Sequence, residues 1–336
     1  MTSSVSLLGS STAQGERLAD LRQQMDNLSR EVTTGQVSDT YSGLGTNAEP
    51  LMNLNSQQPM LQSYLGNIST VSNTMTLMNN ALSQITNVGN QLVTAIQTQL
   101  QNSPTNLQNV QQLAQQGLQT VENMINQNNN GQYLFAGSNG SSPPFVDNST
   151  LNSNFTNQIN NWLQTGDTPT LLSNINGFSA TSLGLSSSLA TSGNVTAQIS
   201  DNQTVDYTIN ANNAGFMNII RALTLVANTP YPSGTDVATG ADFENVMNNA
   251  LTTAQQGVSQ VNATAQTLAG KFAQVNAAKT NNTNDLTLVQ NQISSLSSAD
   301  TTTAIAQMQA LQTQLTSSYQ VTNLVSKMSL VNFLTF

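Results

Sequence analysis

The feature that most constrains how this chain can fold is an apolar repeat in its second half. Hydrophobic residues recur at alternating spacings of three and four over residues 258–275 and, in phase, over residues 286–296, with the polar Lys279 and Asn282 in between. Such spacing is typical of a helix that buries one stripe of its surface against another helix. A helix over residues 242–297 would be roughly 80 Å long at about 1.5 Å per residue. Because a globular domain seldom needs that length, the repeat predicts a helical rod.

Stripes of the same kind predict further helices earlier in the chain. One is expected over residues 51–100 and another over residues 107–125. Between them, Ser103 is predicted to cap the second helix and Pro104 to take its first position. The run of asparagines before Gly131 predicts a turn where this helix ends.

Both ends of the chain carry amphipathic helices with this spacing. Gly35 is predicted to end the first helix, and Ser298-Ala299-Asp300 to break the long helix and cap the last one. A lone two-helix hairpin has little core, so we expect the terminal stripes to pack on each other and, for full order, on further copies of the chain. The residues predicted to make these contacts are Leu18, Leu21, Met25, Leu28, Val32, Met308, Leu311, Leu315, Tyr319, Val325 and Met328.

A compact apolar segment, GQYLFAGSNGSSPPF, separates two tracts rich in Gln, Asn and Thr. It predicts a strand over residues 132–136, with Tyr133 and Phe135 on one face and the residues that alternate with them on the other. Gly137 is expected to let the chain reverse, and the double proline to hold it extended afterwards. The marked residues of this segment are Tyr133, Leu134, Phe135, Ala136, Gly137, Pro144 and Phe145.

The part of the chain after this segment shows weaker patterns. Residues 146–193 are predicted to be irregular apart from one short amphipathic helix that places Trp162 in the core. Alternating apolar residues on both sides of Asp201-Asn202 predict a hairpin, and a helix is expected to end before Pro230.

These elements together predict a mainly α fold with a smaller β or irregular outer domain. The rod is expected to be a long antiparallel coiled coil built from both ends of the chain. Three parts are predicted: terminal helices in residues 1–40 and 300–336, a helical rod domain with β-hairpins in residues 41–145 and 195–299, and an outer projecting domain in residues 146–194.

Composition excludes several classes of function. The chain has 336 residues, of which only 7% are charged, and its net charge of −9 provides no basic patch for nucleic acid. It contains no His and no Cys, so imidazole bases, thiol nucleophiles and the usual zinc ligands are absent. The acidic residues are scattered singly. We therefore expect no enzyme activity, no catalytic residue, no metal site and no cofactor.

The sequence also predicts no membrane insertion. No apolar run approaches the roughly 18 residues of a membrane-spanning helix. The stretch MTSSVSLLGSS lacks the basic and apolar regions of a cleaved secretory signal.

Three stretches resemble the flagellin superfamily and, within it, the hook–filament junction proteins (the hook-associated protein 3 family). LADLRQQMDNLSREVTTGQVSD resembles the N-terminal helix of the family, and LTSSYQVTNLVSKMSLVNFL its C-terminal helix. QYLFAGSNGSSPPF is similar to the "YLFAG…PF" segment of the junction proteins, which typical flagellins lack. One departure is YSGLGTNAEP, where many relatives carry a "DDP" step, and residues 146–193 are poorly covered.

The resemblance implies a structural role in the bacterial flagellum. In the family, terminal helices form an inner tube, long helices form a rod layer around it, and the middle of the chain projects outward. The subunits are exported unfolded by the flagellar type III apparatus with the help of an export chaperone, and no signal peptide is cleaved. A junction protein forms a ring between the hook-side hook-associated protein and flagellin. The expected location is the extracellular hook–filament junction.

Two other functions remain open from the sequence. The chain could be a flagellin, the subunit of the filament itself, or a secreted coiled-coil adhesin whose outer domain binds a surface ligand. An enzyme finds no support, because no nucleophile lies next to a candidate base in the sequence.

Overall fold

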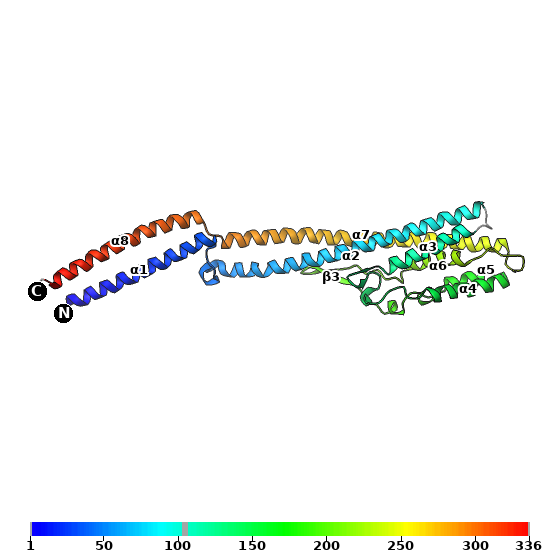
Figure 1. Cartoon of the computed structure of the whole chain (residues 1–336), viewed down its shortest axis with the longest axis horizontal. Coiled ribbons are helices and arrows are strands. Elements are labelled where there is room, and N and C mark those ends of the chain that lie inside the picture. The colour runs from blue at the N-terminus through cyan, green and yellow to red at the C-terminus, as the bar shows by residue number, and fades with distance from the viewer. Residues whose placement is uncertain (1, 103–106, 335–336) are drawn as a thin grey trace. The chain divides into compact units, whose positions relative to one another are not determined.

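The structure is a computed structural model that describes residues 2–102 and 107–334 (Figure 1). Long α-helices dominate it, and the strands form two small two-stranded sheets. The predicted fold class, mainly α with a small β part, is therefore confirmed. The chain divides into two compact units, Met1–Gln62 with Thr283–Phe336 and Ser63–Asn282. The division into terminal, rod and outer parts stays a prediction.

The first unit is built around two terminal helices, α1 (Thr2–Thr34) and α8 (Thr301–Leu334), which lie side by side and antiparallel (Figure 1). Gly35 ends α1 with a φ of 69°, as predicted. The loops at this end of the helix pair are joined by backbone hydrogen bonds. Val37 N donates to Ser297 O at 2.8 Å, and Ala299 N donates to Gly35 O at 2.9 Å.

Two very long helices contribute residues to both units. They are α2 (Ala48–Asn102) and α7 (Gly240–Ser297), the second of which confirms the helix that the apolar repeat predicts. A short 3₁₀ helix, Tyr41–Asn47, precedes α2. The predicted cap at Ser103 and Pro104 lies outside the described residues.

The second unit adds shorter helices and the two sheets. The helices are α3 (Gln108–Ile125), α4 (Asn148–Thr165), α5 (Thr168–Asn176) and α6 (Ala214–Asn228). Strands β1 (Asn128–Asn129) and β2 (Gln132–Tyr133) form one antiparallel pair, and β3 (Thr196–Ser200) and β4 (Gln203–Asp206) form the other. The second pair is the hairpin that the sequence predicts around Asp201-Asn202.

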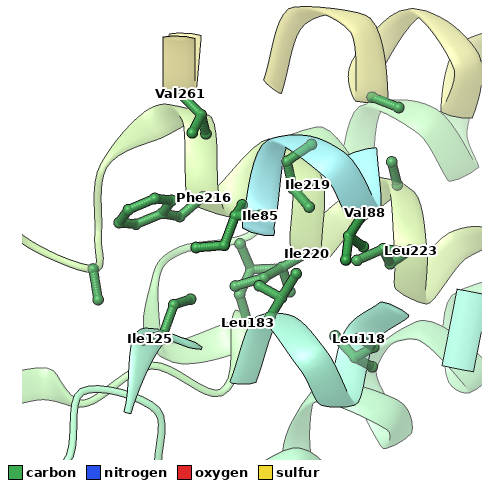
Figure 2. Packing of buried hydrophobic residues seen from close by; sticks show 14 of the residues in the cluster. Ile85, Val88, Leu118, Ile125, Leu183, Phe216, Ile219, Ile220, Leu223 and Val261 are labelled. Carbon is green, nitrogen blue, oxygen red and sulfur yellow. The ribbon is translucent and has the colours of Figure 1, made fainter. Parts of the chain in front are cut away.

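One continuous apolar core fills the second unit. Figure 2 shows Ile85 of α2, Leu118 of α3, Phe216 of α6 and Val261 of α7 converging on it. Helices α2 and α7 approach each other closely at Gly89, which has no side chain. A β-carbon at this position would lie only 2.5 Å from Val258 Cγ2. Packing of the apolar faces is thus the main force that holds this unit together.

The segment after α3 is less strand-like than its sequence predicts. Only Gln132–Tyr133 form a strand, and the expected alternation of faces is wrong, because Leu134, Phe135 and Ala136 are all buried. The ladder begins at a tight turn, where Asn130 and Gly131 have φ values of 53° and 80°, as in a two-residue hairpin. It ends after two pairs because the chain then folds inward and buries Leu134 and Phe135 in the core.

Residues 146–193 are more regular than predicted. The expected helix through Trp162 extends over all of α4, and its indole Nε1 donates to Thr168 Oγ1 at 3.0 Å in the core. A second helix, α5, was not predicted. Its signals are present in the sequence, since Asp167 caps it and Pro169 lies in its first turn.

Four of the sixteen acidic residues of the chain lie at the starts of helices. Asp147, Asp167 and Asp300 each accept backbone N–H groups at the beginning of α4, α5 and α8. Asp242 does so together with Thr239 at α7, where each side chain accepts from the other residue's backbone N–H. The scattered carboxylates thus have a structural use.

Asp147 gives a testable dependence on pH. Hydrogen bonds from the Ser149 and Thr150 hydroxyls, and then from backbone N–H groups, lower the pKa of Asp147 to about 2. Because this is below the unfolded value of about 3.9, its contribution to stability is full above about pH 4 and is lost as the pH falls towards 2. Asp147→Asn keeps a capping oxygen but does not titrate. We expect the melting temperature of the wild type relative to this variant to be constant above pH 4 and to fall below it. A difference that stays constant down to pH 2 would contradict the assignment.

Candidate functional site: the terminal helix pair and the Gln132–Phe145 segment

The terminal helices contact each other through the predicted stripes. On α1, all five predicted residues, from Leu18 to Val32, are half-buried. On α8, Leu315 is buried and Met308 and Leu311 are half-buried. The side chains of Val325 and Met328 lie outside the described residues. The structure therefore brings the described members of the predicted set together along one seam.

A polar contact crosses the same seam. The Arg22 guanidinium donates to the Tyr319 hydroxyl, with Nε at 2.8 Å, and its Cζ lies 5.6 Å from the centre of the tyrosine ring. Arg22 thus reaches the partner helix, where the tyrosine ring offers a hydroxyl acceptor and a face for the cation.

The other side of α8 carries apolar side chains without cover in the single chain. Leu324 is 61% exposed and Val321 51% exposed, whereas Leu315 is 5% exposed. Leu324 follows Leu315 by nine residues, about two and a half helical turns, so the two point to opposite sides of the helix. A single copy of the chain thus buries only one of two apolar faces of this helix.

The Gln132–Phe145 segment lies in the core of the second unit. Phe135 is fully buried, and its ring meets that of Phe216 edge-on with 5.3 Å between centroids. Its carbonyl accepts from Ala211 N at 2.8 Å, just beyond the second hairpin. The aromatic character of the segment is thus explained by packing.

Gly137 makes the reversal that the sequence predicts. Its φ is 60°, and a β-carbon there would lie 2.8 Å from Ser192 Oγ and 3.0 Å from Gly193 O. The next residue, Ser138, donates its N–H to Gly193 O at 3.0 Å and accepts from Gly193 N at 2.7 Å. Only glycine combines this backbone conformation with so close an approach.

Asn126, which the sequence did not single out, fixes the end of the segment. Its side chain donates to Phe145 O at 2.8 Å and accepts from Phe145 N at 2.9 Å, as a paired strand would. Phe145 is buried, and Pro144 O accepts from Ser186 N at 2.8 Å. The sequence signals this contact only by an asparagine directly after α3. Many residue types are found at the end of a helix, so the signal is weak.

The described residues bring no three acidic side chains together that could hold a metal ion. None of the helices in residues 2–102 and 107–334 has the length and apolar character of a membrane span.

Glu122 is half-buried, and this burial raises its pKa despite the hydrogen bond from Asn148. The Arg221 guanidinium is also half-buried, which lowers its pKa, and it donates to Phe178 O at 2.9 Å.

The comparisons with known proteins give a fold and no family. No family model and no curated protein matches the sequence. Among solved structures, the chain is similar to a "putative flagellar hook-associated protein" from Vibrio parahaemolyticus, with a TM-score of 0.55 and 11% sequence identity. The match covers 75% of this chain and 97% of the other. The two proteins share a fold.

Proposed function

We propose that this chain is a structural subunit of the bacterial flagellum, an adaptor that joins the hook-side hook-associated protein to the flagellin filament. Copies of the chain pack through their terminal helices into a ring in the flagellar axis. The role is mechanical and involves no catalysis and no cofactor. Its partners are other copies of itself, the hook-side protein, flagellin and an export chaperone.

The observation that carries this proposal is the uncovered apolar face of α8. A helix that is apolar on two sides needs a second partner besides α1, and the exposure of Leu324 and Val321 supports a partner on that side. Side-by-side packing of identical helix pairs would bury this face in every copy. The low charge of the chain also suits an assembled subunit, since residues 50–121 contain no Asp, Glu, Lys or Arg.

Two further observations favour a flagellar junction over other coiled-coil assemblies. The fold is that of a protein named as flagellar hook-associated. The QYLFAG…PPF segment resembles that of the junction proteins and not that of typical flagellins. Export by the type III apparatus and an extracellular location at the hook–filament junction follow from this proposal.

Deletion of the gene tests the proposed role. We expect cells that keep intact hooks but carry no filaments, with flagellin monomer released into the medium. Restoring the wild-type gene should restore filaments. Filaments of normal length and number in the deletion strain would rule out an essential junction adaptor.

The purified chain separates the remaining alternatives. Electron micrographs that show long filaments formed by this chain alone would favour a flagellin. Hydrogen exchange that finds α1 and α8 strongly protected in the lone protein, in a stable soluble oligomer, would favour an adhesin. The adaptor predicts neither result, because its terminal helices gain their protection from neighbours in the assembled ring.

A further inference from the structure

The polar break in the apolar stripe of α7 has a structural cause. Asn282 occupies a stripe position and is only 4% exposed, while its neighbours Asn281 and Thr283 are exposed. A buried amide destabilises a fold unless it is hydrogen-bonded. Its Nδ2 donates to Ile199 O, in strand β3, at 2.7 Å.

The carbonyl that Asn282 binds belongs to a residue that has no partner in the β3–β4 register. The register shifts between Gln198, which pairs with Thr204, and Ser200, which pairs with Gln203. Ile199 is therefore the extra residue of a bulge, and it is fully buried. Asn282 thus supplies a donor to a residue that no residue of β4 faces.

Helix α2 holds the same hairpin from its own side. Asn67 Nδ2 donates to Gln198 O at 3.2 Å, and the Tyr64 hydroxyl donates to Asp201 Oδ1 at 3.4 Å. Adjacent carbonyls of β3, at residues 198 and 199, are thus bound by different helices. The hairpin bridges α2 and α7 where α7 lacks its usual apolar contacts.

We propose that the β3–β4 hairpin is a latch that holds α2 and α7 together at this level, and that Asn282 is the residue that positions it. The bulge presents the Ile199 carbonyl to α7, and Asn282 is the group on α7 that captures it. A leucine at this position would continue the stripe but would leave the carbonyl unsatisfied. The polar break is therefore a docking position for the hairpin.

Hydrogen exchange of Asn282→Leu tests the positioning role. Leucine has nearly the same size as asparagine but cannot donate to Ile199 O. We expect amide exchange in β3 and β4 to accelerate by about tenfold or more, the effect of losing one buried hydrogen bond, while α3 and α6 are unaffected. Asn281→Leu makes the same change at an exposed neighbour and should leave the hairpin unchanged. Equal hairpin protection in the two variants would overturn the assignment.

A variant on the other helix tests the latch itself, and it also serves if Asn282→Leu does not fold. Asn67→Ala removes the hydrogen bond from Asn67 of α2 to Gln198 O in the hairpin and leaves Asn282 of α7 unchanged. If the hairpin is a latch, exchange should accelerate both in β3 and in the last turns of α7 before Asn282. Asn73→Ala, at another exposed position of α2, is the matched control. Acceleration confined to the hairpin would show passive attachment and would refute the latch.

Discussion

Replacing Phe135 with alanine is expected to lower the free energy of unfolding of the Ser63–Asn282 unit by about 3–5 kcal/mol. The ring is fully buried and packs edge-on against Phe216, so its removal leaves a cavity and also loses an aromatic pair. The backbone on either side is fixed by the Ala211–Phe135 hydrogen bond and by the turn at Gly137, so the site has little freedom to collapse. Urea unfolding followed by circular dichroism would measure the change.

Val146→Ala is the control for this experiment. Val146 directly follows the same segment but is 55% exposed, so its truncation should change stability by no more than about 0.5 kcal/mol. A loss below about 1 kcal/mol for Phe135→Ala would contradict the structural role of the segment. It would then point to a contact with a partner as the reason for its aromatic character.

Replacing Leu324 with aspartate is expected to abolish incorporation of the chain into flagella and leave the lone chain folded. Leu324 is 61% exposed in the single chain, so a carboxylate there costs little before assembly. In the proposed ring the same position is covered, and an unpaired buried charge costs several kcal/mol. Incorporation should therefore fall by at least about tenfold, since about 1.4 kcal/mol already corresponds to that factor. Complementation of the deletion strain, with filaments counted by electron microscopy, would measure it.

Asn323→Asp is the matched control on the next residue. It adds the same charge at an exposed polar position of α8 that faces a different direction. This variant should support normal filaments. If Leu324→Asp also supports them while its circular dichroism spectrum is unchanged, the outer face of α8 is not a subunit contact, and the proposed packing is wrong.

The long helices could be predicted from the sequence because their signal repeats many times. The spacing in residues 258–296 continues for so many turns that two polar interruptions do not obscure it. The ends of α1 and α8 could be predicted for a different reason. Gly35 and Asp300 have local chemistry that determines the backbone around them.

Short elements and long-range polar contacts could not be predicted in this way. The strand after Gly131 stops after two residues because burial of Leu134 and Phe135 overrides alternation, and burial depends on the whole unit. The pairing of Arg22 with Tyr319 joins residues 297 positions apart, and no local spacing reveals such a contact. For Asn282, the sequence shows that the apolar stripe is interrupted, but it does not show that the side chain binds the Ile199 carbonyl.

In the candidate site, the stripe residues were predictable as a set, but their division into inner and outer faces was not. Tyr319 was assigned to the seam and does contact Arg22, yet its side chain remains 42% exposed. The sequence pattern did not distinguish the outer face of α8, with Val321 and Leu324, from the face that packs on α1. When a helix has apolar residues on two sides, its sequence does not show which side packs on the first partner helix.

The aspartates that start helices also affect how the whole chain carries charge in acid. Hydrogen bonds lower the pKa values of Asp147, Asp167, Asp206, Asp242 and Asp300, while burial raises only that of Glu122 among the acids with a shifted value. Near pH 4 the folded chain therefore binds fewer protons than the unfolded chain. We therefore expect the isoelectric point of the folded protein to lie below the value of about 4.1 that its composition gives, and unfolding to move it upward.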